Sequence, residues 1–490
     1  MTARLNRRRA VQAMAAGVLA AGARGALPAW GLPAPNDLAP PDALLERVGG
    51  MAALGPRLPG SIAHARFVDD LDARFVEAGL TIQRDRFTFT RWTAEAWSLE
   101  VLHPRAEPDR IPVASAYTYS GATGPDGVTG QLVDLGRPGA QTLVRGLRGA
   151  VVLFDAPAAP IRGAALRAAR DGGWDPDGQI RGRDNYTRAW ITGMAAAPLA
   201  PFRRAGAIAA IVVLDASAAN AAGQYVPFIH PLQGLPALIV DRDTGARLRA
   251  RRGASIRLTL RARVDPGTST DSLLAVLPGA SAETILVHTH TDGPNAVEEN
   301  GGIALAELAR WASRRSWHRT LAFSAVTGHF GPGLPETRGL LHRHPEMRRR
   351  AVASLTLEHL GAREWIDDDG GYHPTGRPEI GVAFHSLTGI RGSLQASLRE
   401  SDLRRTVMLP PAGPRFFGVG ADLHAAGIPS AAYITGPNYL LSDVPGGHLD
   451  KFDPHRMRAE ITWAAALLNR LDRIEAWKLR AGDSLLLRGR

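Results

Sequence analysis

The sequence contains no cysteine among its 490 residues. This absence excludes disulfide bonds, thiolate zinc sites, a cysteine nucleophile and a lipid-modified cysteine anchor. Any metal ion must therefore be held by histidine, aspartate and glutamate side chains. The chain also lacks an apolar run of the ~20 residues that a membrane-spanning helix requires, so no integral membrane segment is predicted.

Lysine is scarce, because Lys451 and Lys478 are the only two and the other basic residues are arginines spread along the chain. The formal net charge is +11, and residues 1–29 contribute five arginines and no acid, which leaves about +6 on the remainder. We find no basic helix with interleaved aromatic residues and no nucleic-acid-binding motif. No nucleic acid is therefore predicted as a partner.

Residues 1–29 have the order of features found in an export signal. Three arginines at positions 7–9 precede a weakly apolar Ala/Gly-rich stretch, residues 10–23, and small residues follow. The adjacent arginines favour the twin-arginine route. We expect an exported protein, periplasmic or secreted, with the twin-arginine export machinery as a partner. The alternative is a frayed basic terminus that results from a misplaced start codon.

The rest of the chain is long enough for two or three domains, and it divides into stretches that differ in local composition and in the pattern of apolar residues. Residues 42–104 read as helix, turn, helix and strand, after a Pro-rich linker. Residues 105–266 contain short β-like runs between Gly, Pro and Asp turns. Residues 269–475 alternate strands with helices, and a basic tail, 476–490, ends the chain.

The expected strands are short apolar runs bounded by turn residues. In the last stretch they are residues 273–276, 284–289, 320–325, 352–357 and 431–434. Ser61 is expected to cap a helix that Gly79 ends. The apolar positions of this helix are Phe67, Val68, Leu71, Phe75 and Val76. Alternation of strands and helices predicts an α/β fold with a mainly parallel or mixed central sheet and helices on both faces.

Residues 284–302 give the strongest indication of chemistry. A short apolar run ends in His290 and Asp292, and Glu299 follows just before the next expected helix. A strand that delivers an imidazole and a carboxylate at its carboxyl end places them where open α/β sheets hold their sites. Imidazole and carboxylate suit zinc. The alternative is a strand that ends in a polar loop with His290 exposed.

Several motifs occur in an order that resembles the zinc exopeptidase family of bacterial leucine aminopeptidases, glutamate carboxypeptidase and the transferrin receptor. The motifs that carry the resemblance are residues 55–61, 132–136, 147–153, 205–207, 235–241, 270–279, 427–429 and 451–454. The resemblance covers nearly the whole chain after the signal. It implies a zinc exopeptidase-like fold, with residues 105–266 as a β-rich protease-associated insert domain.

The resemblance also implies a hydrolytic site in which a carboxylate bridges two zinc ions and a glutamate acts as general base, and the departures described below leave one or two zinc ions as the expectation. His290 and Asp292 match the first ligand and its orienting aspartate. Glu299 stands where the family has its bridging aspartate, and Glu358 stands where an aspartate ligand follows a strand. Another divalent metal can replace zinc on such ligands.

Two departures from the family pattern alter this site. The family has paired glutamates, a base and a ligand, where this chain has His329 and Phe330. Phenylalanine cannot bind a metal, and His329 either replaces the base or becomes a ligand. The family's last histidine ligand falls on Asp443, with His448 nearby as the alternative.

For each candidate ligand a structural role is the competing interpretation. Glu299 can simply lead into the following helix, since acids favour helix starts. Glu358 can be a solvated strand end, with His359 beside it as the active member of the pair. His288 lies on the same strand face as His290 and is expected to be structural.

Three functions remain open at this point. The first is an exported metal-dependent hydrolase of the aminopeptidase type that acts on a peptide or small amide. The second is a catalytically degenerate binding or scaffold protein on the same fold. The third is a single-metal cyclase or acyltransferase. Arg363 and Arg415 are candidates for binding a substrate carboxylate, and both can equally be surface charges.

Overall fold

The computed structural model describes residues 37–137, 146–156, 160–412 and 416–482. The predicted export signal and the end of the predicted basic tail, residues 483–490, lie outside this part of the chain. None of the described helices is long and apolar enough to cross a lipid bilayer.

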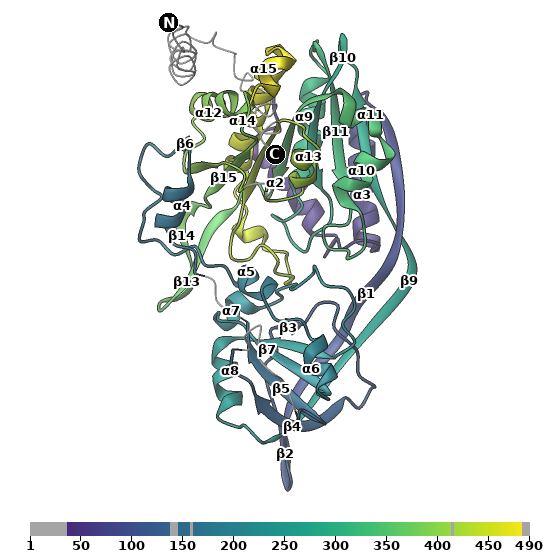
Figure 1. Cartoon of the computed structure of the whole chain (residues 1–490), viewed down its shortest axis with the longest axis vertical. Coiled ribbons are helices and arrows are strands. Elements are labelled where there is room, and N and C mark those ends of the chain that lie inside the picture. The colour runs from purple at the N-terminus through teal and green to yellow at the C-terminus, as the bar shows by residue number, and fades with distance from the viewer. Residues whose placement is uncertain (1–36, 138–145, 157–159, 413–415, 483–490) are drawn as a thin grey trace, which may run out of the picture. The chain divides into compact units, whose positions relative to one another are not determined.

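A large mixed sheet is the main element of the described chain (Figure 1). Its central strands, in spatial order, are β9 (Ser255–Leu277), β11 (Arg319–Val326), β10 (Ser281–His290), β12 (Ala351–Glu358), β17 (Ser430–Thr435), β15 (Gly381–His385) and β16 (Thr406–Leu409). Strand β10 pairs in parallel with β11 and β12, and β12 pairs in parallel with β17. The predicted α/β class and all five strands predicted for this stretch are confirmed.

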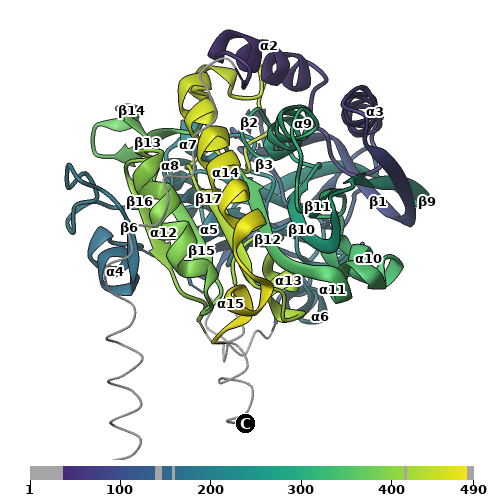
Figure 2. The ribbon, with the colours of Figure 1, turned by 90° about the horizontal axis from the view of Figure 1, so that it is seen from above.

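Side chains of β10 alternate between two apolar cores, as the period of a strand requires. Ile285 and Val287 belong to the core of one face, and Leu286 belongs to the core of the other. Figure 2 shows helices on both sides of the sheet. On the first face lie α3 (Ile62–Glu77), α9 (Gly301–Ala312) and α14 (Pro454–Arg473), and on the second α10 (Glu336–Arg343), α11 (Pro345–Arg350) and α13 (Ala421–Ala425).

Helix α3 begins and ends where the sequence predicts. The Ser61 hydroxyl accepts a hydrogen bond from the His64 backbone N–H at 3.0 Å, and Gly79 adopts a φ of +81° just after the helix. Four of its five predicted apolar positions are buried. The prediction for Val76 is wrong, because this side chain is 60% exposed on the outer side of the helix.

Two strands of 23 residues, β1 (Thr81–His103) and β9, pair in an antiparallel ribbon that joins the central sheet to the segment predicted as an insert. Figure 1 shows this ribbon running along one side of the molecule. At its far end β9 pairs with β4 (Val128–Asp134), which continues in parallel through β5 (Ala150–Asp155), β7 (Ala209–Val213) and β8 (Ala237–Val240). The assignment of residues 105–266 as a protease-associated domain stays a prediction.

The insert segment returns to the central sheet through hydrogen bonds near β17. Trp190 Nε1 donates to the Pro437 carbonyl at 2.9 Å, and Arg188 Nε donates to the Gly436 carbonyl at 2.7 Å. Trp190 belongs to α5 (Ala189–Met194). These contacts hold aromatic side chains of the insert over the carboxyl end of the sheet.

His64 gives the fold a testable dependence on pH. Burial lowers the pKa of His64 to about 3, with a further contribution from Arg57. Its two nitrogens contact the hydroxyls of Thr291 and Thr270. Because the unfolded chain takes up this proton near pH 6.5, each pH unit below 6.5 and above 3 costs the folded state about 1.4 kcal/mol.

We therefore expect His64→Gln to reduce the loss of stability between pH 7 and pH 5 by about 2 kcal/mol. Urea unfolding at the two pH values measures this difference. The matched control is His342→Gln at an exposed position of α10, which is expected to leave the pH dependence unchanged. Equal pH dependence of the unfolding free energy in the wild type and in His64→Gln would refute the conclusion that buried His64 stays neutral in the folded state.

Candidate metal centre

Polar side chains from four segments meet at the carboxyl end of the parallel strands. His290 ends β10, Glu298 lies in the following loop, His329 follows β11, and Glu358 and His359 follow one another at the end of β12. Four of them are at most 4% exposed, and only His329 is partly accessible. Apolar strands that are buried on both faces thus end in a cluster of ionisable groups.

Two histidines of this cluster present an unprotonated nitrogen to its centre. His290 Nδ1 lies 2.9 Å from the Asp292 backbone carbonyl, and His359 Nδ1 lies 2.8 Å from the Thr435 carbonyl. Because a carbonyl only accepts, each Nδ1 must carry the hydrogen, which leaves the Nε2 lone pair free. This is the tautomer in which histidine binds metals through Nε2.

The carboxylates of Glu298 and Glu358 face these nitrogens. His290 Nε2 lies 3.8 Å from Glu358 Oε2, and His359 Nε2 lies 3.3 Å from Glu298 Oε2. The other oxygen of Glu358 accepts the Val419 backbone N–H at 3.0 Å. Carboxylate and imidazole groups therefore lie within 4 Å of one another in the cluster.

Several atoms of the cluster are buried without a hydrogen-bond partner. They are His290 Nε2, both carboxylate oxygens of Glu298, Glu358 Oε2 and His359 Nε2. Unpaired buried polar atoms are costly, and a bound cation would satisfy all five. Two three-residue groups, His290–Glu298–His329 and His290–Glu358–His359, have ligand atoms within 4.8 Å of one another. Their oxygen and nitrogen donors fit zinc.

Burial shifts the proton equilibria of the cluster. It lowers the pKa of His290 well below its ordinary value, and it raises the pKa of Glu358. Burial also lowers the pKa of His359, but the carboxylates of Glu298 and Glu358 outweigh it and raise the value overall. A divalent cation favours charged carboxylates and neutral imidazoles. These are the protonation states in which the residues of the cluster can bind a metal.

Glu299, the predicted bridging ligand, has a different partner. Its carboxylate accepts from Arg57 Nε in an ion pair in which both side chains are fully buried. Arg57 also donates to the carbonyls of Met51 and Asn295. The structure thus brings Glu298, rather than Glu299, to the histidines. No local sequence signal marks this choice, because it depends on the buried guanidinium of Arg57, which lies 242 residues away in the chain.

Asp292 positions the neighbouring loop with its carboxylate. Its two oxygens accept the backbone N–H groups of Gly328 at 3.0 Å and Phe330 at 2.7 Å. Only its main-chain carbonyl contacts His290. Asp292 therefore fixes the place of His329 directly, and it orients His290 through the backbone.

His329 faces two carboxylates. Its Nε2 lies 3.9 Å from Glu298 Oε1 and its Nδ1 lies 3.6 Å from Glu336 Oε1. Burial lowers the pKa of His329, but Glu336, Glu298 and Asp292 outweigh it and raise the value to about 10. Phe330 beside it is fully buried and packs on Phe228 of the insert, with ring centroids 4.5 Å apart.

The predicted last ligand does not join either ligand group. Asp443 is exposed, and its backbone N–H donates to the Gly223 carbonyl at 2.8 Å. His448 Nδ1 accepts from Lys451 Nζ at 2.8 Å. Arg363 is exposed, and the predicted alternative Arg415 lies outside the described residues.

A cavity of about 470 Å³ opens over the cluster. Its polar wall contains Glu298, His329, Glu336, Glu358 and His359. Its apolar wall comes from the insert and from loops of the central sheet, through Trp190, Ile191, Met194, Phe228, Ile229, Phe417, Leu440 and Leu441. The arrangement gives a small substrate access to the candidate ligands under an apolar roof.

Comparison with known proteins gives a likeness of fold. No protein-family model and no curated protein sequence matches the chain. Among solved structures, a zinc aminopeptidase from Bacillus subtilis is similar at a TM-score of 0.60 and 14% identity, covering 89% of this chain and 97% of that one. A peptidase M28 precursor from Shewanella amazonensis gives a TM-score of 0.60, 17% identity, and 90% and 96% coverage.

The aminopeptidase from Aneurinibacillus sp. strain AM-1 gives a TM-score of 0.58 at 16% identity, covering 89% of this chain and 95% of that one. Similarity over nearly the full length at such low identity is evidence about the fold. The chain has the fold of the zinc aminopeptidases and M28 peptidases.

Proposed function

We propose that this protein is a metal-dependent amide or peptide hydrolase with one metal centre, held by His290, Glu298 and Glu358. The observation that carries the proposal is the convergence of five buried nitrogen and oxygen atoms that lack partners. His359 is the candidate fourth ligand, since its Nε2 is directed to the same carboxylates. Zinc fits this donor set, and another divalent ion remains compatible with it.

A single metal is proposed because the residues for a second one are replaced. The family resemblance places a second carboxylate ligand at Phe330, which is apolar and packed among aromatic rings. It places the last histidine near Asp443 or His448, and neither belongs to the ligand groups. The proposal therefore departs from a two-zinc aminopeptidase.

Zinc bound at this centre supplies a Lewis acid that polarises a carbonyl and lowers the pKa of water. Because the pKa of His329 is raised to about 10, its ring is protonated at neutral pH and is placed to donate a proton to the leaving amine. Glu336 faces its other nitrogen and holds the ring in place. Trp190 and Phe228 exclude bulk water from the reacting groups.

The cellular setting is part of the same proposal. Residues 1–29 have the features of a twin-arginine export signal, which supports a periplasmic or secreted enzyme. A ligand set without thiolates suits an oxidising compartment, because it contains no cysteine ligand that could be oxidised.

Metal content tests the ligand assignment. Residues 30–490, purified without chelator, are expected to hold one zinc per chain by inductively coupled plasma mass spectrometry. Glu298→Gln is expected to weaken zinc binding at least tenfold, on the order of the loss of a ligand or its close support. The adjacent Glu299→Gln is the matched control and is expected to keep zinc, because its partner is Arg57.

Loss of zinc in Glu299→Gln with retention in Glu298→Gln would reverse the ligand assignment. Two zinc ions per chain would refute the single-metal proposal. No zinc after metal is added back would instead support a binding or scaffold protein.

Replacement of His329 separates catalysis from metal binding. We expect His329→Gln to lower kcat by roughly 10²–10⁴-fold on a cleavable amide, because the proton donor to the leaving amine is lost. The zinc content is expected to stay at one per chain. His342→Gln, on the surface of α10, serves as the control and should leave kcat unchanged. If zinc is lost together with activity, His329 is a ligand and the proposed role is wrong.

A further inference from the structure

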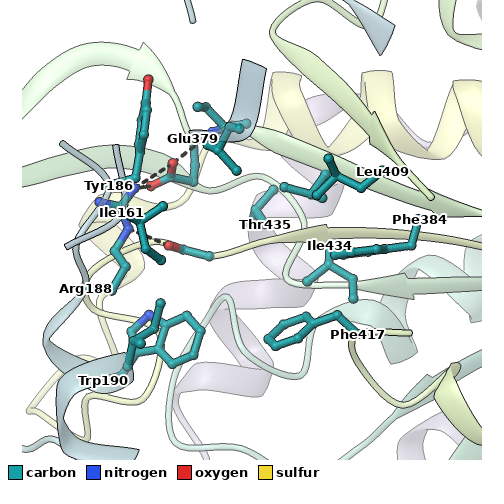
Figure 3. Close-up of a pocket in the computed structure, with 15 residues that line it drawn as sticks. Ile161, Tyr186, Arg188, Trp190, Glu379, Phe384, Leu409, Phe417, Ile434 and Thr435 are labelled. Carbon is teal, nitrogen blue, oxygen red and sulfur yellow. Dashed lines mark hydrogen bonds and ion pairs between the residues drawn. The ribbon is translucent and has the colours of Figure 1, made fainter. Parts of the chain in front are cut away.

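A second cavity of about 220 Å³ lies beside the cavity over the metal centre. We call it the side pocket (Figure 3). One wall comes from the insert, through Tyr186, Arg188, Trp190 and Ile191, and the other comes from β15, β16 and β17. Trp190, Ile191 and Phe417 line both cavities, so the two spaces adjoin at these three side chains.

Strand β17 connects the side pocket to the candidate ligands. Thr435 lines the pocket, and its carbonyl accepts the hydrogen of His359 Nδ1 at 2.8 Å. A Cβ atom at Gly418 would lie 2.3 Å from Glu358 Oε1 and 2.4 Å from Ile434 Cδ1. A single glycine therefore separates a proposed metal ligand from the pocket wall. A group attached to a carbonyl at the metal centre would enter the pocket past Trp190, Ile191 and Phe417, which line both spaces.

The side pocket is apolar apart from one ion pair. Its other lining side chains include Ile161, Leu166, Ile380, Val382, Phe384, Leu409 and Phe417. Arg188 Nη2 donates to both oxygens of Glu379 at 3.0 Å, and both side chains are buried. This pair cancels its own charge. Arg188 Nη1 is buried and has no partner.

With the proposed metal bound, each carboxylate of the described lining is engaged, and none is left for a substrate ammonium group. Glu379 is paired with Arg188, and Glu336 faces His329. Glu298 and Glu358 face the histidines of the metal centre. Burial of an unpaired ammonium group against apolar side chains is strongly unfavourable. The two cavities therefore favour a substrate whose acyl part carries no charge.

We propose that the side pocket binds the acyl part of the substrate, and that this part is an uncharged apolar group. The substrate class is then an N-acyl amide, rather than a peptide with a free terminal amino group. The inference rests on the proposed hydrolase function. Water adds to the amide carbonyl, the carbon–nitrogen bond breaks, and the products are a carboxylic acid and an amine that receives a proton from His329.

The test compares substrates of graded acyl length with aminoacyl substrates. The zinc-loaded protein is assayed with acetyl, butyryl, hexanoyl and phenylacetyl 4-nitroanilides and with leucyl 4-nitroanilide. We expect kcat/KM to rise roughly fourfold per added methylene until the pocket is filled. Leucyl 4-nitroanilide is expected to be cleaved at least about tenfold more slowly than the hexanoyl compound, because its ammonium group must be desolvated.

Two variants locate the effect. Val382→Phe fills the pocket from β15 and should abolish the preference for the longer acyl groups while acetyl cleavage continues. Phe417→Ala removes a half-exposed side chain from the pocket wall and should reduce the same preference without destabilising the apolar core. Val264→Phe, on an exposed part of β9, is the matched control for Val382→Phe. It should change neither the cleavage of the acetyl compound nor the preference for longer acyl groups.

Calorimetric titration of hexanoyl anilide into His329→Gln separates the pocket from catalysis. Binding there, weakened at least tenfold by the added Val382→Phe change, supports the pocket even if the wild type cleaves none of the amides. In that case the proposed hydrolase function alone fails. Faster cleavage of leucyl than of hexanoyl 4-nitroanilide, with no effect of Val382→Phe or Phe417→Ala, overturns the side-pocket proposal and leaves the hydrolase function standing.

Discussion

Parallel pairing of β10 with β11 and β12 is the constraint on which the candidate site depends. His290 lies opposite Val326, and the ends of all three strands reach one edge of the sheet. Because the strands are buried on both faces, the polar groups that follow them meet in a largely buried place, which water reaches only through the cavity above them. Their unpaired nitrogen and oxygen atoms then carry a free-energy cost that a cation would remove.

Backbone carbonyls, rather than carboxylates, fix the histidines of this centre. Asp292 and Thr435 each use a main-chain oxygen to hold an Nδ1 hydrogen, and so direct Nε2 inward. The Asp292 carboxylate is left free to bind the loop that carries His329. A sequence motif identifies the aspartate but does not show whether its carboxylate or its main-chain carbonyl makes the contact. Here Asp292 uses its carbonyl for His290 and its carboxylate for the loop that carries His329.

The long ribbon of β1 and β9 determines what covers the centre. It carries the chain away from the sheet and returns it, so that Trp190 and Phe228 of the insert lie over ligands from β10 and β12. This roof is apolar, and it extends into the side pocket. The same ligands under a polar roof would suit a different substrate, since the solvation of the bound group sets the preference.

The sequence by itself determined the α/β class, the main strands, the capped helix α3, and the candidates His290, His329 and Glu358. These follow from local periodicity and from residues at strand ends, which are short-range properties. Only the tertiary structure decided between Glu298 and Glu299, placed both Glu358 and His359 in the cluster, brought in Glu336, and left Asp443 at the surface. Adjacent side chains of a loop point in different directions, and here the choice depended on buried Arg57, more than 240 residues away in the chain. Such a contact has no local signature.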